Sequence, residues 1–259
     1  MRPGLLRDDL AAILALLPPL AWLWPQDHWV ASRLLFCAVL IFGWQALFAQ
    51  VRRQGMGLHG AVAAMLVALF APMGVPFWQL ALGVSFGMVL GEAIFGGRGR
   101  NFVQPVALTF AFMAFSFADQ PWRQGPDLPL IAILPALAFL VITGQARLTV
   151  LAGLAAGLAG VSALIAPEQM TMLITGTLLL ALLFLTADPA VSGATSLGRL
   201  AYGVLAGGLT ALFAASGPVF GAVVFATLLA QIFAPLLDHI AIVIHSAWMH
   251  HRARRLRNG

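Results

Sequence analysis

Charged residues and cysteine are scarce in this chain. Only 9% of its 259 residues are charged, whereas a soluble domain carries about 25%. The single cysteine, Cys37, excludes an intrachain disulfide, a cysteine-ligated iron–sulfur cluster and a multi-thiolate zinc site. Lysine is absent, so the basic character comes from 14 arginines. The chain also lacks a phosphate-binding loop, a dinucleotide-binding glycine fingerprint and a Ser–His–Asp arrangement, so no catalytic centre of its own is evident.

Apolar residues dominate what is present. They make up 61% of the chain, and the mean hydropathy is +0.95. Apolar runs long enough to approach the ~20 residues of a membrane span follow one another almost without pause. We therefore predict an all-α integral membrane protein of about ten transmembrane helices, forming a single polytopic domain over residues 1–259. The spans are expected at about 9–25, 30–50, 57–72, 76–95, 102–118, 128–144, 148–166, 169–187, 197–215 and 218–236.

The arginines predict the orientation of these spans. If the N-terminus lies inside, the inner segments hold twelve arginines and the outer segments only Arg33 and Arg123. Such a bias is typical of inner loops. Both termini are thus expected in the cytoplasm, in a bacterial inner membrane, with a basic cytoplasmic tail at 245–259. We interpret the tail as an ordinary anchor, with attraction to anionic membrane lipid as the alternative. Nucleic acid is not expected as a partner.

Two polar stretches interrupt the apolar pattern on the predicted inner side. The first is 91-GEAIFGGRGRNFVQPVAL-108, where glycines permit a tight or re-entrant backbone, amides supply donors and acceptors, and a proline frees a carbonyl one turn back. The second is 185-LTADPAVSGATSLGR-199, with an acid, a proline and several hydroxyls. Paired interruptions commonly mark a binding site in transporter-like folds. Two well-capped cytoplasmic turns are the alternative. The candidate residues are Gly97, Gly99, Asn101, Gln104, Pro105, Asp188, Ser192 and Thr195.

Other polar residues have simpler interpretations. Glu92 and Asp238 lie near helix ends, where an acid usually reaches water. The glycines of 152–160 and 203–208 are interpreted as helix-packing faces. The histidines do not have the spacing of a metal or haem site.

Long, ordered motifs resemble one family, NqrB/RnfD. The run 76-PFWQLALGVSFGMVLGEAIFGGRGRNFVQPVALTFAFMAF-115 closely resembles NqrB, a membrane component of the sodium-translocating NADH:quinone reductase. The runs 186-TADPAVSGATSLGRLAYGVLAGGLTALF-213 and 222-AVVFATLLAQIFAPLLD-238 are similar to RnfD, a membrane component of the Rnf electron-transport complex, which belongs to the same family. The resemblance covers roughly residues 50–240.

The resemblance implies a flavoprotein subunit with a urea-transporter-like bundle that relays electrons between flavins and on to quinone or a partner, in some members with ion movement. It implies a flavin, either riboflavin or FMN, beside the inner break. Asn101, Gln104 and Pro105 would line that site and Asp188 would face them. Gln104 stands where relatives carry Asn. Partners would include other subunits of an electron-transport complex or a flavinylated partner.

Thr195 raises the question of a covalent flavin, since Ser192-Gly193-Ala194-Thr195 reads like an acceptor for FMN. In the family the covalent FMN is expected on an outer loop after the fifth span. That loop here, 119-DQPWRQGPDLP-129, contains no Ser or Thr. The predicted inner position of Thr195 therefore favours a noncovalent flavin over an ester at Thr195. The loss of the outer loop site also leaves open a channel or carrier for a small solute such as a flavin.

Overall fold

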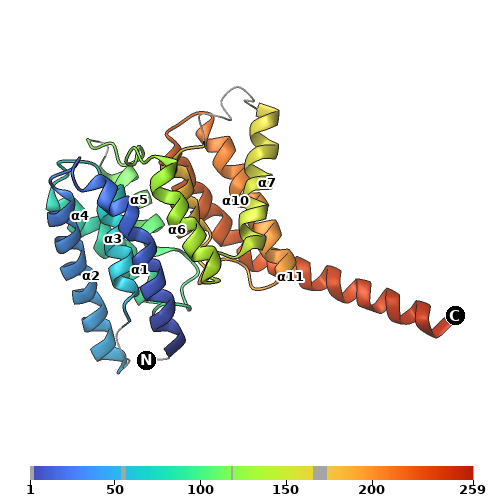
Figure 1. Ribbon diagram of the computed structural model, residues 1–259. Coiled ribbons are helices and arrows are strands. Elements are labelled where there is room, and N and C mark those ends of the chain that lie inside the picture. The colour runs from blue at the N-terminus through green and yellow to red at the C-terminus, as the bar shows by residue number, and fades with distance from the viewer. Residues whose placement is uncertain (1–2, 54–56, 118, 166–173, 259) are drawn as a thin grey trace.

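The computed structural model describes residues 3–53, 57–117, 119–165 and 174–258, and all regular structure in these ranges is helical. Figure 1 shows the bundle and the long final helix. The elements are α1 (Pro3–Leu23), α2 (Val30–Arg52), α3 (His59–Phe70), α4 (Phe77–Met88), η1 (Val89–Ala93), α5 (Pro105–Ser116), α6 (Leu130–Ile142), α7 (Leu148–Ile165), α9 (Gly176–Ala181), η3 (Leu182–Thr186), α10 (Ser196–Ala214) and α11 (Val219–Asn258).

Each of the ten predicted apolar segments overlaps a helix. By length and apolar composition, α2, α7, α10 and the first part of α11, through Ile244, are able to cross a membrane. Among the described residues, five further apolar helical segments, with 10–17 residues, are shorter: α3, α4 with η1, α5, α6, and α9 with η3. The start predicted for the eighth span, residue 169, lies outside the described residues.

Two of the short helices are buried in protein. Ten of the twelve residues of α3 are buried, as are all five of η3, which continues α9. α3 packs against α1, α2 and α5, whereas α9 packs against α6 and α11. Backbone groups near the ends of such short helices face neighbouring protein instead of lipid, and a bilayer tolerates interrupted helices only under that condition.

An aromatic cluster fills the core beside the end of α3. The rings of Phe70 and Phe220 stack with centroids 4.4 Å apart, and the edge of Phe110 meets Phe220 at 5.0 Å. All three side chains are buried, and Trp122 of the loop after α5 packs against Phe110. Offset and edge-to-face contacts of this kind add to the burial of apolar area. The cluster ties α3, α5 and α11 together.

Glycines bring α7 and α10 into close contact, as the sequence predicts. A Cβ added to Gly157 would overlap the carbonyl oxygen of Val204, and one added to Gly203 would lie 2.5 Å from the carbonyl oxygen of Val150. The two backbones approach closely because these positions carry no side chain.

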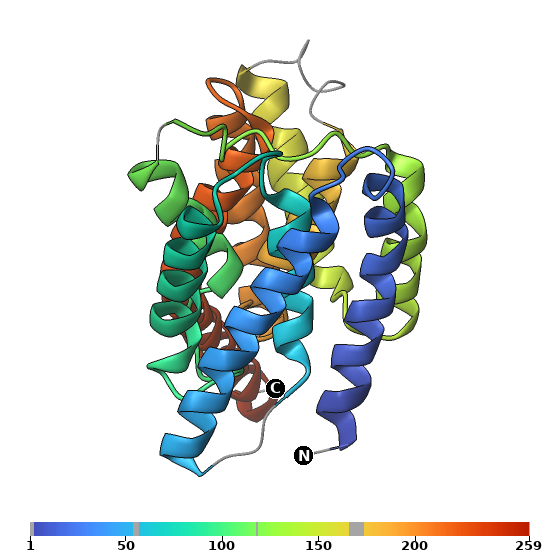
Figure 2. The same cartoon turned by 90° about the vertical axis from the view of Figure 1, so that its left-hand side faces the viewer.

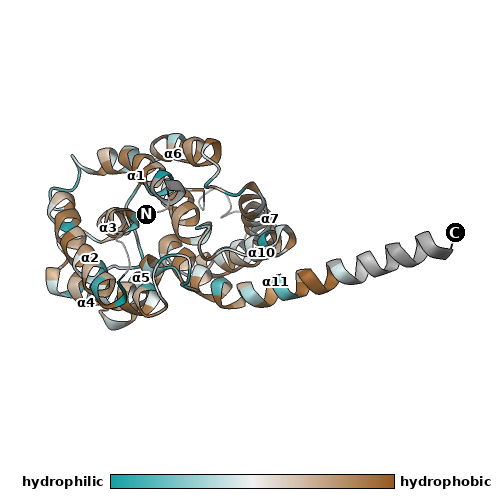
Figure 3. Cartoon of the chain, turned by 90° about the horizontal axis from the view of Figure 1, so that it is seen from below, coloured by the Kyte–Doolittle hydropathy of each residue, from teal (hydrophilic) through white to brown (hydrophobic). Residues whose placement is uncertain are grey.

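The final helix is longer than predicted. α11 runs unbroken from Val219 to Asn258, so the segment predicted as a separate basic tail continues the tenth span. No glycine or proline follows Pro235 before Gly259, and nothing in the sequence therefore stops the helix earlier. Its distal half leaves the bundle, with the N- and C-terminal ends toward the same end of the molecule (Figures 1 and 2). Brown, the colour of hydrophobic residues, predominates along the helices of the bundle in Figure 3.

Candidate functional site

Each polar interruption begins in a π-helical turn. The first begins within η1 and the second within η3. Such turns inside helices occur frequently at functional sites because they leave backbone groups displaced from the regular ladder. Hydroxyl and amide side chains satisfy those groups after α9. The Tyr202 hydroxyl donates to the Thr186 carbonyl at 2.9 Å, and Gln231 donates to the Leu185 carbonyl at 3.3 Å.

The glycine turn after η1 adopts conformations that other residues rarely enter. Gly96, Gly97 and Gly99 have φ angles of 113°, 94° and 86°. Asn101 then fixes the loop, because its Oδ1 accepts from the Gly99 amide at 3.0 Å and its Nδ2 donates to the Val103 carbonyl at 3.0 Å. Both ends of the Asn101 amide are thus used within the loop.

Gln104 begins α5 as its N-cap. Its Oε1 accepts from the Ala107 amide at 2.7 Å, and Pro105 occupies the first helical position. The Gln104 backbone amide donates to Gln231 Oε1 at 2.8 Å. The Gln104 Nε2 makes no hydrogen bond to the described residues. This side-chain donor remains available to a ligand.

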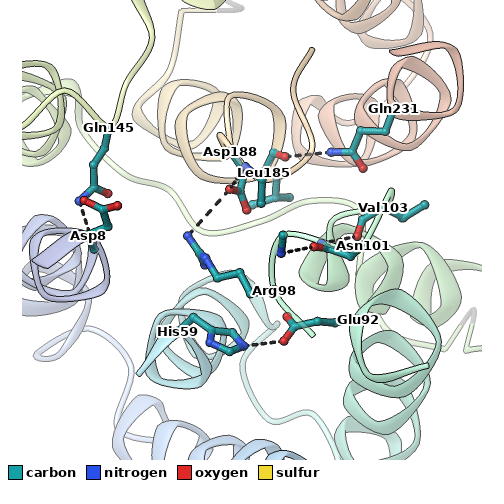
Figure 4. A network of polar contacts seen from close by, with 12 residues as sticks. Asp8, His59, Glu92, Arg98, Asn101, Val103, Gln145, Leu185, Asp188 and Gln231 are labelled. Carbon is teal, nitrogen blue, oxygen red and sulfur yellow. Dashed lines mark hydrogen bonds and ion pairs between the residues drawn. The ribbon is translucent and has the colours of Figure 1, made fainter. Parts of the chain in front are cut away.

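Gln231 joins the two interruptions. This buried α11 side chain accepts from Gln104 on one side and donates to Leu185 on the other. Figure 4 shows it beside both stretches of chain. The sequence analysis missed Gln231, because a single amide in an apolar helix gives no spacing signal.

One pocket lies between the interruptions, here named the inner pocket. It has an empty volume of about 690 Å³. Four predicted residues, Asn101, Gln104, Pro105 and Asp188, line it. Asp188 accepts from the Ala190 amide at 3.0 Å and lies 3.9 Å from the Arg98 guanidinium (Figure 4). The remaining wall includes His59, Glu92, Arg98 and Gln145 together with apolar side chains such as Leu66, Leu140, Leu183 and Phe184.

Four other predicted residues lie outside this pocket. Gly97 lines a neighbouring pocket, and Gly99 contributes through its bond to Asn101. Ser192 is buried in the turn, and its hydroxyl has no hydrogen-bond partner among the described residues. Thr195 begins α10 as its N-cap.

Thr195 and Asp238 form the cap of α10 together. The Thr195 hydroxyl accepts from the Gly198 amide at 3.0 Å and donates to Asp238 Oδ1 at 2.8 Å. Asp238 also accepts from the backbone amides of Ala194 and Thr195. Asp238 was interpreted as an acid near a helix end that reaches water; it is partly exposed and in addition binds the amides at a helix N-terminus.

The environment of Glu92 also differs from the one predicted. It is buried rather than solvated, and its Oε1 lies 2.5 Å from His59 Nε2. The two residues lie 33 positions apart, on α3 and η1, and no sequence spacing relates them.

A second pocket, the outer pocket, lies at the opposite end of α3, with an empty volume of about 680 Å³. Asp27 lines it and forms a buried ion pair with Arg33. Arg33 also donates to the carbonyls of Ala68 and Pro72, at 3.1 Å and 2.9 Å, where α3 ends. The charge of Arg33, one of the two arginines predicted on the outer segments, is therefore neutralised by Asp27 inside the protein.

Comparison with known proteins gives a consistent family. The sequence model of the NQR2, RnfD, RnfE family matches residues 7–128 and 127–244. The B component of the Na(+)-translocating NADH-quinone reductase of Pseudomonas aeruginosa strain LESB58 is 29% identical over 255 residues, which covers 77% of this chain and 63% of that protein. The Azotobacter vinelandii counterpart is 27% identical over 266 residues (80% and 66%), and the Chromohalobacter salexigens counterpart is 28% identical over 254 residues (77% and 62%).

The chain spans 62–66% of the length of these relatives. The family match nevertheless includes both interruptions, the inner pocket between them and most of the helices around it. This all-helical, multi-pass membrane protein belongs to the NQR2, RnfD, RnfE family.

Proposed function

We propose that this protein is a membrane subunit of an Nqr/Rnf-like electron-transport system and binds a flavin noncovalently in the inner pocket. It relays electrons to a partner or to quinone, and the complex couples this to ion movement. The relatives bear the name of a Na(+)-translocating NADH-quinone reductase subunit. The observation that carries the proposal is the single pocket that brings Gln104 and Asp188 together from two interruptions.

The pocket suits a flat ring with polar edges. Leu66, Leu140 and Phe184 supply an apolar wall, while Gln104 Nε2 and Arg98 supply donors. When bound, a flavin would supply the redox chemistry, and the protein would tune it through hydrogen bonds and burial. Asn101 would act by holding the glycine turn, since its own amide is already bonded.

The state of Thr195 supports noncovalent binding. An ester at its hydroxyl would remove the donor to Asp238 and disturb the cap of α10. A covalent FMN on Thr195 would thus destabilise the turn that positions Asp188.

The same proposal includes the topology. Ten spans in one domain over 1–259, arranged in a urea-transporter-like bundle, place both termini in the cytoplasm of a bacterial cell. The segments predicted as inner meet at one end: Gln145 donates to the Asp8 carbonyl at 2.6 Å, and Arg147 donates to the Gly193 carbonyl at 3.4 Å. Partner subunits or a flavinylated partner would supply the remaining redox centres.

Purification of the chain tests the flavin. The protein should be yellow, with flavin absorbance that bleaches on reduction and flavin that acid extracts. Gln104→Glu keeps the Oε1 acceptor that caps α5 but removes the Nε2 donor, and should lower flavin content several-fold. Gln124→Glu, on the exposed outer loop, is the matched control and should retain it. A colourless wild-type protein without extractable flavin would contradict the proposal.

A channel or carrier for a small solute such as a flavin is the second candidate. Leu66 lines the inner pocket and Leu69 lines the outer one, so about one turn of α3 separates them. Proteoliposomes without a redox partner should then accumulate the solute, and Leu66→Ala with Leu69→Ala should accelerate uptake. Redox activity without any uptake would remove this candidate.

A further inference from the structure

The contact between His59 and Glu92 forms a wall shared by two pockets. Both side chains line the inner pocket, and both also line a side pocket of about 520 Å³ between α2 and η1. Trp44, Phe48 and Arg52 line the far wall of that side pocket. The pair is therefore in contact with the space proposed for the flavin and with a second cavity.

The geometry of the pair suits the transfer of a proton. His59 Nε2 is hydrogen-bonded to Glu92 Oε1, and the two side chains are only 13% and 9% exposed. A proton between these atoms can be bound either by the Glu92 carboxylate or by the imidazole nitrogen of His59. Little water reaches the pair, so a change of protonation must pass through neighbouring groups.

The Gln45 amide can adapt its hydrogen bonding to such a change of protonation at His59. Its Nε2 lies 2.8 Å from His59 Nε2, while its Oε1 is buried without a hydrogen-bond partner among the described residues. An amide carries donors at one end and an acceptor at the other. The Gln45 amide could therefore present its Nε2 donor to a deprotonated His59 Nε2. After a half-turn it would present its Oε1 acceptor to a protonated Nε2, and this would also give Oε1 a hydrogen-bond partner.

Charged groups face the pair from several elements. Asp9 of α1 lies near His59 and accepts from the Leu58 backbone, at the predicted inner end. Arg98 approaches from the glycine turn through the inner pocket. Arg52 of α2 binds the Ala93 carbonyl beside Glu92. Asp9 thus gives His59 a connection toward the predicted inner end of the bundle.

We propose that His59 and Glu92 are a proton-exchange pair that gives a proton to the ligand of the inner pocket and takes it back. The inference rests on the proposed flavin. With a flavin bound and two electrons supplied by a redox partner of the complex, the pair would give its one transferable proton to a ring nitrogen of the isoalloxazine. His59 and Glu92 would then be left as a neutral imidazole and a carboxylate. A proton arriving past Asp9 restores the pair, and reoxidation reverses the transfer.

Proton sharing can be tested without any flavin. In protein labelled with ¹⁵N-histidine, loss of one signal in His59→Gln identifies the His59 resonance. Its Nε2 shift should lie between those of a bare and a protonated nitrogen, and Glu92→Gln should move it to one extreme. Asp119→Asn, an acid-to-amide change on the exposed outer loop, should leave it in place. A shift that Glu92→Gln does not move would overturn the pair.

Proton transfer can be tested in the flavin-containing protein by stopped-flow reduction with dithionite between pH 6 and pH 8, as approximate limits of the working range. In the wild type and in Asp119→Asn, the rate should change little with pH because the pair supplies the proton. In Glu92→Gln and His59→Gln, it should fall steeply with rising pH, by about 10²-fold at the alkaline limit. Added acetate should restore the rate of Glu92→Ala.

The outcomes separate the two proposals. Wild-type protein without flavin would overturn both the flavin site and the pair's role. Flavin retained at wild-type level, with unchanged pH profiles in both variants, would overturn the pair alone. If Glu92→Gln does not fold, His59→Gln decides the matter, because glutamine keeps a hydrogen bond to Glu92 but does not carry an exchangeable charge.

Discussion

Arg98 lies 3.9 Å from Asp188 and connects two stretches of chain that are 90 positions apart. The contact crosses the inner pocket from the glycine turn to the Asp-Pro turn (Figure 4). The Arg98 side chain is 30% exposed, so the pair contributes little to folding, at most about 1 kcal/mol. Its significance lies in placing a positive charge over the proposed ligand.

Replacement of Arg98 should affect ligand retention more than stability. Arg98→Ala removes the guanidinium from the inner pocket, and we expect a several-fold loss of bound flavin with a nearly unchanged melting temperature. Arg100→Ala, two residues along on the same turn but outside the pocket, should retain flavin at the wild-type level. Equal flavin contents in the two variants, measured by absorbance and extraction, would contradict the assignment.

Thr195 should behave as a helix cap. Thr195→Val removes both hydroxyl hydrogen bonds and should lower the free energy of unfolding by about 1–2 kcal/mol. Thr143→Val, whose hydroxyl only donates to carbonyls within its own helix end, should have a smaller effect. Thermal unfolding in detergent measures both. Mass spectrometry of the wild type should show no FMN increment on the peptide containing Thr195; such an increment would contradict the noncovalent assignment.

The α7–α10 contact provides a stability test with a control on the same helix. Gly157→Ala places a methyl group against the backbone of α10 and should cost about 1–3 kcal/mol. Gly160→Ala, where no atom lies within 4 Å of the added carbon, should be neutral or stabilising by up to about 1 kcal/mol. Similar melting temperatures for the two variants would show that α7 and α10 can move apart without loss of stability.

The buried pair at the outer end should be sensitive to removal of one partner. Asp27→Asn leaves the Arg33 charge buried, with only the Ala68 and Pro72 carbonyls to bind. We expect the free energy of unfolding to fall by about 3 kcal/mol, the lower end of the range for a buried ion pair that loses one partner. Asp127→Asn, at an exposed position on the wall of the same outer pocket, should stay within about 0.5 kcal/mol. An equally small effect of Asp27→Asn, measured by thermal unfolding, would contradict this.

The apolar segments and both interruptions could be predicted from the sequence, because run length and breaks by glycine, proline and amides are local signals. Gln104 and Asp188 were predicted to approach one another, and both line the inner pocket. The contacts that join the interruptions were not predictable. Gln231 lies 127 positions from Gln104, and its role depends on how α11 crosses the bundle.

Helix ends were the least predictable feature. Asp238 and Glu92 were both interpreted as acids near water, although one caps a helix and the other is buried against His59. The environment of each acid depends on a partner from another helix or turn. Its position in the sequence shows only how far it lies from the end of an apolar run. In the π-helical turn η3, the carbonyls of Thr186 and Leu185 are likewise bound by Tyr202 and Gln231 from other helices, and these contacts give no local signal in the sequence.

The length of α11 has a consequence for the surrounding bilayer. Its apolar part, Val219–Ile244, has 26 residues and measures about 39 Å at ~1.5 Å per residue. A hydrocarbon layer is about 30 Å thick. Such hydrophobic mismatch is relieved when the helix leans by about 40°, or when the lipid thickens locally around it. A host membrane of different thickness would therefore change the tilt of α11 relative to the bilayer.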